Sequence, residues 1–420
     1  MSNSVTNDLT LTASRGEGRR RRRRDSTTVS VNWITNYAEM SAFIPEWREL
    51  YERGGRQNPF ASPDWLVPWA RHFVHERNLA MLAIRRNGEL IGLAPWHIRR
   101  TGGLLRRLQL LGSGQHAMLT ELPQVLSLPG ESRSVLRAAV TELFRNSHRW
   151  DLFELPLMAD QGWFEPEWLD VEAGWSGQVQ HIVTRAANIL PLPTDKADLQ
   201  KTLKRNLLES IHRSRNRLTR QADSWTVTVH EDVAGIEYAL PVLTRLHSAR
   251  SHMAKRRHHP DYLSADGRKE FLSEALRGMA ESGRAEILTL DVDGTEIAAQ
   301  IVLHAADSAY IGFSGVDPDW WKVGAVTLLQ WHAAESAIEH GRQTFNLSVG
   351  PNLAKLRWSE QIVQHPGFAV SAPRLYSQLA FTGYCAAAAV ISARREAAYR
   401  RVGGSRPALL EAILRRERRG

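Results

Sequence analysis

The clearest candidate for chemistry in this chain is an anion site at the start of a helix. An apolar run at residues 309–314 predicts a strand, and a loop at 315–323 leads into a stretch with helical spacing that ends at His340. Gly324 and Ala325 begin that helix. The first N–H groups of a helix have no partner within it and lie at the positive end of its dipole, so they attract anions.

Side chains that can accept a proton are spread along the chain, and their order alone does not single one out. By type the candidates are His252, His258, His259, His332, His340 and Asp317. The segment 251–262 holds three of these histidines together with Asp261, a spacing that permits metal ligands. A solvated loop explains the segment as well, so we predict no metal site.

The composition is that of an ordinary globular chain. Of 420 residues, 43% are hydrophobic and 24% charged, which predicts two or three domains with a sizeable core. The single cysteine, Cys385, excludes an intrachain disulfide. Six arginines at residues 19–24 supply much of the net charge of +9, so we expect no stable nucleic-acid complex. No apolar segment follows them, which predicts no secretion signal and a cytoplasmic protein.

Residues 375–393 carry no charged side chain and are long enough to span a bilayer. They include Ser377, Gln378 and Thr382, so the segment is only mildly apolar. We expect a packed helix here, and contact with a membrane is the less favoured interpretation.

Hydrophobic spacing predicts helices and strands in alternation, and therefore an α/β (α+β) fold. Helices are expected at 36–51, 63–73, 131–148, 201–220, 236–251, 268–282 and 324–340. Strands are expected at 79–84, 90–94, 107–111, 151–155, 225–229, 285–291, 296–304, 309–314 and 344–348. A disordered arginine-rich tail is expected at 1–29, and a helical extension at 373–420.

The chain contains an internal repeat. Residues 82–91 match residues 288–297 at a constant offset of 206. Asn87-Gly88 in one copy and Asp293-Gly294 in the other lie between apolar runs, which is a strong signal for a β-hairpin. Strand, helix and strand follow in each half. We therefore predict two copies of one α/β unit, at 30–190 and 191–372.

This order of elements resembles the GNAT acyltransferase fold. More closely it resembles the double-domain CelD-like group associated with cellulose biosynthesis, which is related to the Fem-type peptidyltransferases. The resemblance covers roughly residues 32–370 and rests on segments 58–69, 85–95, 110–112, 201–220, 291–298, 313–317, 324–329 and 350–358. It implies two tandem GNAT-like domains, each with a mixed central sheet flanked by helices. It also implies an N-acyltransferase that takes acetyl-CoA or another acyl-CoA as co-substrate.

The resemblance implies that the pantetheine arm pairs with the edge of strand 309–314 and that the pyrophosphate lies at the helix start. The residues expected to bind acyl-CoA are Phe313, Ser314, Gly315, Lys322, Val323, Gly324 and Ala325. The usual loop signature is Gln or Arg, two residues, Gly, one residue, then Gly or Ala. This chain has Trp321 at the first position and Val326 at the last, so Lys322 is the candidate partner of the phosphates. A plain helix start with close packing is the alternative.

Two residues are expected to take part in catalysis, Lys355 and Asp317. In the resembled families a lysine in this late position lies near the acceptor site. Its ammonium group would stabilise the oxyanion of the tetrahedral intermediate, a contribution of about 3–4 kcal/mol. A surface lysine paired with Glu360 is an equally good interpretation. Asp317 is a candidate base by type alone.

The implied acceptor is a small-molecule or glycan-linked amine, bound in the cleft between the two halves. We expect the first half to be structural or acceptor-binding, because Glu131 would repel phosphate at its equivalent helix start. The basic helix at 201–220 would steer an anionic substrate or contact polysaccharide-synthesis machinery, although packing alone explains its apolar stripe. Two alternatives stay open: Fem-like transfer from an aminoacyl-tRNA, and a catalytically degenerate scaffold for polysaccharide export.

Overall fold

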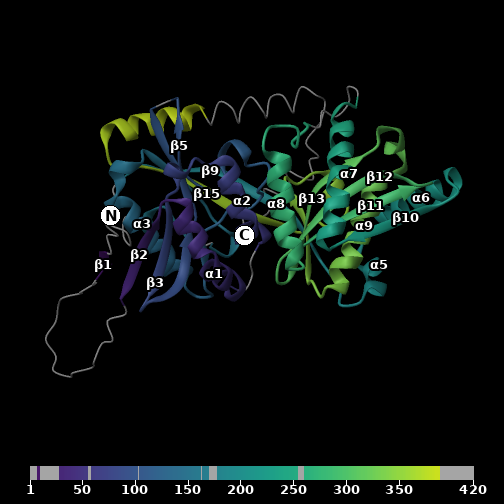
Figure 1. Ribbon diagram of the computed structural model, residues 1–420, viewed down its shortest axis with the longest axis horizontal. Helices are drawn as coiled ribbons and strands as arrows, with labels where there is room; N and C mark the ends of the chain where they lie inside the picture. Colours follow the sequence, from purple (N-terminus) through teal and green to yellow (C-terminus); the bar gives the residue numbers. More distant parts are fainter. Residues whose placement is uncertain are drawn as a thin grey trace, which may run out of the picture.

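Two β-sheets form the framework of the molecule, and helices pack against them (Figure 1). The computed structural model describes residues 7–9, 28–54, 58–102, 104–161, 163–169, 177–253 and 260–387. Elements of the first half lie at one end of the long axis and those of the second half at the other (Figure 1). Most of the predicted tail, and the C-terminal extension beyond 387, lie outside the described residues.

The smaller sheet belongs to the first half, and its strand order is β1-β2-β3-β4-β7. The bounds are β1 Asn7–Leu9, β2 Val29–Ile34, β3 Met81–Arg86, β4 Glu89–Ala94 and β7 Leu126–Ser127. Helices α1 (Tyr37–Arg53) and α2 (Pro63–Phe73) follow β2, and α3 (Ser132–Arg145) follows β7. Asn36 and Ser62 each accept a hydrogen bond from a backbone N–H of the first turn, which explains why α1 and α2 begin where predicted.

The larger sheet runs through both halves in the order β10-β11-β12-β13-β14-β9-β15-β8-β6-β5. Its strands from the first half are β5 Trp96–Thr101, β6 Leu105–Leu110, β8 Leu152–Pro156 and β9 Val179–Pro191. The others are β10 Trp225–His230, β11 Ala285–Val292, β12 Thr295–His304, β13 Ser308–Val316, β14 Thr344–Val349 and β15 Ile362–Ser371. Because β15 pairs with β8 and β9 pairs with β14, the predicted boundary at 190/191 lies inside a continuous sheet.

The internal repeat appears in the structure as two hairpins with the same geometry. Asn87 and Gly88 have φ values of 51° and 87°, and Asp293 and Gly294 have 51° and 82°. These positive values are what a two-residue hairpin turn requires. The register also shifts between Ile84 and Arg85 in one hairpin and between Leu290 and Asp291 in the other. The bulge therefore recurs at the offset of 206 that relates the two sequences.

The helices of the two halves share a core. Helix α2 packs against α8 (Arg268–Glu281), and the ring centroids of Trp65 and Phe271 lie 5.0 Å apart. Helix α7 (Val233–Ser251) packs against β13 and β12. The halves are thus joined by a sheet on one side and by an aromatic cluster on the other.

One predicted helix is wrong as a single element. Residues 201–220 belong to two helices, α5 (Leu199–Thr202) and α6 (Arg205–Gln221). Leu203 and Lys204 between them are extended, which buries Leu203 and lets Lys204 Nζ donate to the carbonyl of Leu356 at 3.0 Å. Tertiary contacts therefore break a stretch whose local sequence is uniformly helical.

The segment expected to be a packed helix after the second half is helical from 375 to 387 in the described part. Phe381 and Cys385 are buried against Leu152 and Ala369 of the larger sheet. Within the described residues, no helix combines the length and the apolar character needed to cross a bilayer.

We expect Gly315→Ala to destabilise the fold. A Cβ atom at Gly315 would lie 2.6 Å from the His247 nitrogen and 2.6 Å from Leu246 Cβ, so α7 would have to move away from β13. Overpacking of this kind costs about 1–3 kcal/mol. Urea unfolding should show the loss. The matched control is Gly383→Ala in the C-terminal helix, where a Cβ meets nothing within 4 Å and stability should stay equal or rise. Equal stability of the two variants would contradict this close packing.

Candidate functional site

Strands β13 and β14 separate from each other within the larger sheet. They pair in parallel only from Ser308 opposite Thr344 to Tyr310 opposite Asn346. Beyond Tyr310, β13 stays paired with β12 and β14 stays paired with β9. A gap therefore opens between two neighbouring strands, and the ends of both strands face a cavity.

The cavity has a volume of about 510 Å³, within the usual range for ligand sites. Gly312, Phe313 and Ser314 of β13 line one side, and Ser348 and Val349 of β14 line the other. The first half completes the lining with Phe60, Trp65, Ala117, Met118, Leu119 and Glu121. Both halves of the chain are therefore needed to form it.

Lys355 lies on a short helix, α10 (Leu353–Leu356), that Asn352 caps. Its Nζ donates to the carbonyl oxygens of Ser348 at 2.9 Å and Val349 at 2.7 Å. A lysine ammonium has three N–H donors, so one remains for a ligand in the cavity that Lys355 lines. The predicted alternative, an ion pair of Lys355 with Glu360, is wrong because Glu360 pairs with Lys204.

Ser348 adopts an unusual backbone conformation at the end of β14. Its φ of 72° is rare for a residue with a side chain and costs about 1–3 kcal/mol. Its N–H donates to Asn346 Oδ1 at 2.9 Å, its carbonyl accepts from Lys355, and its hydroxyl donates to Glu121. These three contacts hold the strand end at the edge of the cavity.

Glu121 is a carboxyl group placed between the halves, opposite Lys355. One of its oxygens accepts from the Val349 N–H at 3.2 Å, and Arg185 Nη1 donates to its backbone carbonyl at 3.1 Å. Burial raises the pKa of Glu121, although the Ser348 hydroxyl and Lys355 oppose the rise. Burial also lowers the pKa of Lys355 to about 8, although Glu121 opposes the fall. Both groups therefore titrate closer to neutral pH than usual, as catalytic acids and bases do.

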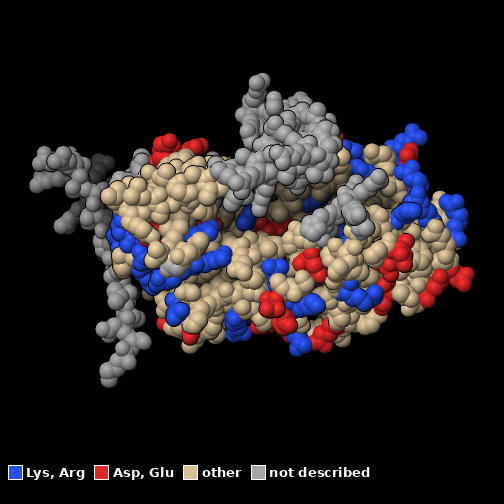
Figure 2. Space-filling view, turned by 90° about the horizontal axis from the view of Figure 1, so that it is seen from above, with Lys and Arg blue, Asp and Glu red and all other residues tan. Residues whose placement is uncertain are grey.

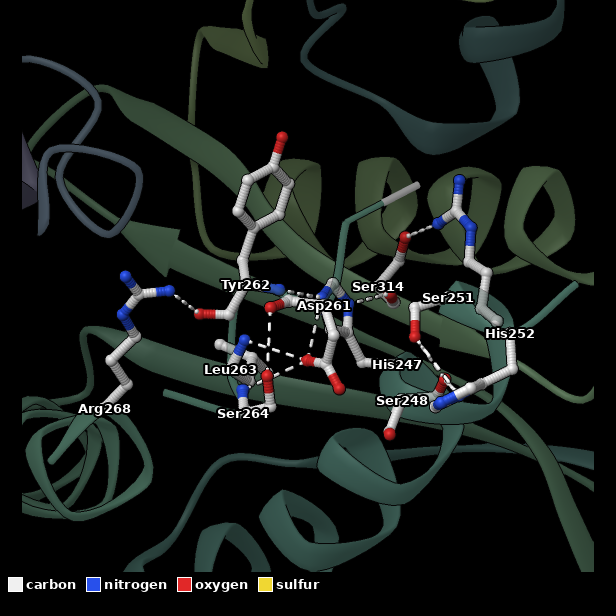
Figure 3. Close-up of polar contacts among 11 residues, drawn as sticks. His247, Ser248, Ser251, His252, Asp261, Tyr262, Leu263, Ser264, Arg268 and Ser314 are labelled. Atoms are coloured by element: carbon white, nitrogen blue, oxygen red, sulfur yellow. Dashed lines mark hydrogen bonds and ion pairs between the residues drawn. The ribbon is translucent and has the colours of Figure 1, made fainter. Parts of the chain in front are cut away.

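His247 of helix α7 contacts Ser314 of β13 (Figure 3). His247 is 1% exposed; its Nδ1–H donates to the Ser314 carbonyl at 2.9 Å, and its Nε2 accepts from the Tyr262 N–H at 3.3 Å. Burial lowers the pKa of His247, so the ring is neutral at pH 7. Because both ring nitrogens are engaged, His247 fixes the position of Ser314.

Arg250 brings a cation to the loop that follows β13. Its Nη1 donates to the Ser314 hydroxyl at 2.9 Å, and its guanidinium lies over the Trp321 ring, 5.4 Å from the centroid. Burial lowers the pKa of Arg250, but a guanidinium remains charged at neutral pH. Trp321 departs from the usual loop signature at its first position, and Arg250 supplies a positive charge beside it.

The predicted site residues fall into two groups. Phe313, Ser314 and Lys355 line the cavity. The others lie outside its lining. Gly315 is in β13, against α7. Asp317 precedes the 3₁₀ helix Pro318–Val323, which contains Lys322 and Val323, and Gly324 and Ala325 are at the start of α9 (Ala325–Glu339). The Asp317 carboxylate accepts from the Asp319 N–H at 2.9 Å and caps that 3₁₀ helix. A role for this second group in binding or catalysis stays a prediction.

Gly324 has a packing reason to be glycine. Its φ is 84°, and a Cβ atom there would lie 2.8 Å from Ser214 Oγ on α6. Arg217 of α6 donates to the Lys322 carbonyl, so the basic helix lies directly on the loop. The close-packing interpretation of this helix start therefore has support from the structure.

The first half has a cavity at the equivalent place. Strands β6 and β8 pair in parallel from Arg107 opposite Leu152, as β13 and β14 do in the second half. The adjoining cavity has a volume of about 420 Å³ and includes Arg107 and Glu154 in its lining. Arg185 lines both cavities, which places them side by side. The two halves therefore correspond not only in their strands but also in the position of their cavities.

Sequence reasoning missed Glu121, Arg185 and Arg250. Glu121 follows a loop without periodicity, and it meets Lys355 only because the two halves fold against each other. Arg250 had only a weak signal in the sequence. It is a cation near the C-terminal end of the helix predicted at 236–251, and only the fold places that helix beside the loop after β13. Of the residues in 251–262 whose spacing permits metal ligands, Asp261 accepts from the N–H groups of Leu263 and Ser264, and His258 and His259 lie outside the described residues.

We expect Glu121 and Lys355 to be energetically coupled. A double-mutant cycle with Glu121→Gln and Lys355→Met should give a coupling energy of about 0.5–3 kcal/mol in urea unfolding, because each charge is buried beside the other. Lys196 and Glu339 form a matched exposed pair, with side chains 56% and 54% exposed, and the same cycle there should give no coupling above error. Equal coupling in the two cycles would contradict the buried pair.

Comparison with known proteins agrees with this geometry. The family model described as acetyltransferase (GNAT) domain matches residues 205–356, which run from the start of α6 to the end of α10. The crystal structure of FemX has a TM-score of 0.53 at 11% identity, covering 77% of this chain and 95% of that one. A conserved protein of unknown function from Bacteroides thetaiotaomicron VPI-5482 has a TM-score of 0.51 at 13% identity, covering 81% and 99%. No curated protein matches the sequence. Residues 205–356 thus match a GNAT acetyltransferase domain, and the fold of the chain is similar to that of FemX.

Proposed function

We propose that this GNAT-type acyltransferase moves an acyl group from acyl-CoA to an amine, in the cavity between β13 and β14. The observation that carries the proposal is the separation of these strands, with Lys355 and Glu121 at the gap. An extended donor arm can lie along a strand end whose neighbour has moved away. Lys355 would then face the thioester of the donor, and Glu121 would face the amine of the acceptor.

The donor side of the site is formed by β13 and the loop after it. Phe313 and Ser314 would contact the acyl-bearing end of the donor, since both line the cavity. Arg250 and Lys322 would face the phosphates, with the N–H groups of the first turn of α9. This assignment explains why Arg250 is buried against Ser314 and Trp321. Among the residues that the structure describes, no acidic side chain forms an ion pair with it.

The chemistry requires a proton acceptor and a group that stabilises negative charge. The amine nitrogen attacks the thioester carbonyl carbon, a C–N bond forms, and the carbonyl oxygen becomes negative. The remaining N–H of Lys355 would donate to this oxyanion, and the Glu121 carboxylate would take the proton that the amine loses. When the oxyanion collapses, the C–S bond breaks and the thiolate leaves with a proton from solvent or from Glu121.

The acceptor would enter where the two halves meet. Phe60, Trp65 and Met118 give this side of the cavity an apolar surface, and Arg185 adds a positive charge. An amine whose remainder is apolar or anionic fits these groups best. A small molecule and a glycan-linked amine both meet this description.

Transfer of an aminoacyl group from tRNA is the second candidate. The observation that favours it is the exposed basic face of α6, which carries Arg205, Arg213, Arg217 and Arg220. Figure 2 shows Lys and Arg side chains gathered at the end of the molecule where α6 lies in Figure 1. Because α6 packs on the loop after β13, a polyanion bound there would lie next to the same site.

The two donors can be separated by binding. Acetyl-CoA should raise the melting temperature of the wild type, and Arg250→Gln should weaken the effect because it removes the cation beside Ser314 and Trp321. The control, Arg205→Gln, changes an exposed arginine of α6 and should leave the effect unchanged. No shift with acyl-CoAs, together with salt-sensitive tRNA binding that Arg205→Gln weakens, would replace the first candidate by the second.

The pH dependence tests the role of Lys355. If its ammonium stabilises the oxyanion, kcat/KM should fall as pH rises through the Lys355 pKa of about 8, because the ammonium loses its proton there. Lys355→Ala should lower kcat by roughly 10²–10³.

Lys355→Arg is the matched variant, since arginine stays charged in this range. Its activity should be lower but should not fall near pH 8. The acceptor amine titrates in the same way in both enzymes, so the difference between the two profiles isolates Lys355. Identical profiles would remove Lys355 from the chemistry, and a wild-type rate that rises relative to the arginine variant would make it the base.

A further inference from the structure

A cluster of potential metal ligands lies at the opposite end of α9 from the loop. Glu286 is near the start of β11, His304 is the last residue of β12, and His340 caps the C-terminus of α9. One ligand atom from each lies within 4.8 Å of the other two. With 15 residues, α9 spans about 22 Å, so this cluster is separate from the cavity and its loop.

The cluster leaves buried polar atoms without partners. Glu286 is 0% exposed and His304 is 2% exposed. Within the described residues, Glu286 Oε1 and both ring nitrogens of His304 have no hydrogen bond. A buried polar atom in this state costs about 1–3 kcal/mol, and such atoms are rare unless water or an ion meets them.

Two pairs of polar atoms in the cluster have the spacing of ligands around a tetrahedral metal ion. His304 Nε2 lies 3.5 Å from Glu286 Oε2, and His340 Nε2 lies 3.6 Å from Glu231 Oε2. Ligand atoms about 2.1 Å from a tetrahedral zinc ion are about 3.4 Å from one another. Glu231 is an exposed residue just after β10 that pairs with His340 on the solvent side of the cluster.

Ser336 orients two of the ligands. Its hydroxyl donates to Glu286 Oε2 at 2.8 Å, and its carbonyl oxygen accepts from His340 Nδ1 at 2.9 Å. A proton on Nδ1 leaves Nε2 of His340 with a lone pair, which is the state that a metal ligand needs. Metal-bound histidines usually have such a partner on the other nitrogen.

A buried ion pair of protonated His304 with Glu286 is the competing explanation. It would place a hydrogen bond between the two groups, but at 3.5 Å neither ring nitrogen of His304 makes one. Arg342 lies near enough for Glu286 to act on its pKa, so Glu286 already has one positive neighbour. A second carboxylate, Glu231, balances the additional charge that a divalent ion would bring.

We propose that Glu286, His304 and His340 bind one divalent transition-metal ion, with zinc as the best match. Two histidine nitrogens and one carboxylate oxygen are a ligand set that zinc binds in proteins. The ion would tie the C-terminus of α9 to β11 and β12. Its role is structural, because it lies away from the cavity.

Metal content tests the proposal directly. The full-length protein, prepared without a histidine tag, is incubated with ZnCl₂, desalted, and measured by elemental analysis. We expect about one zinc per chain, and a higher melting temperature with ZnCl₂ than after treatment with EDTA. Substitution with Co²⁺ should give the visible absorption of a tetrahedral site.

His340→Ala and His332→Ala form a matched pair on the same helix. His340 is 36% exposed and His332, which pairs with Glu335, is 27% exposed, so both variants should fold. His340→Ala should lose the zinc and the Co²⁺ absorption, while His332→Ala should keep both. Ser336→Ala should weaken zinc binding by about 10–100-fold.

Other histidines of the chain can take up zinc, so the difference between the two variants is the decisive result. Equal zinc content in His340→Ala, His332→Ala and the wild type would overturn the proposal. So would a wild type that holds no zinc after desalting and shows no response of the melting temperature to ZnCl₂.

Discussion

The separation of β13 from β14 is the constraint on which the rest of the site depends. After three paired positions the two strands part, and the groups that would have joined them need other partners. Gln300 Nε2 on β12 donates to the carbonyls of Gly312 and Phe313 at 2.9 and 3.1 Å, where the register of β12 and β13 shifts, and Lys355 donates to those of Ser348 and Val349. The same contacts that satisfy the separated strands thus place a cation at the opening.

The second half alone would leave this opening incomplete. Glu121 holds Ser348 and Val349 from the first half, and Arg185 on β9 holds the backbone of Glu121. Arg185 reaches the site because β9 and β15 join the halves in one sheet. The repeat of a single α/β unit therefore does more than form two similar domains. It gives one cavity at the junction and a second, equivalent cavity beside it that shares Arg185.

Features set by neighbouring residues could be predicted from the sequence, and features set by distant contacts could not. The two hairpins follow from Asn87-Gly88 and Asp293-Gly294, and α2 begins at Pro63 because Ser62 caps it. The break at Leu203 was missed because no glycine or proline marks it. β9 and β15 were missed because their partners are remote in the sequence. Glu121 was missed because only the packing of the halves gives it a role.

The most direct test of the central claim is a crystal structure of the protein with acetyl-CoA. The account predicts that the thioester lies between β13 and β14, with its carbonyl oxygen within hydrogen-bonding distance of Lys355 Nζ and its phosphates near Arg250 and the start of α9. Acetyl-CoA bound in the cavity beside β6 and β8, with Arg107 and Glu154 around the thioester, would contradict it. The first half would then be the catalytic one.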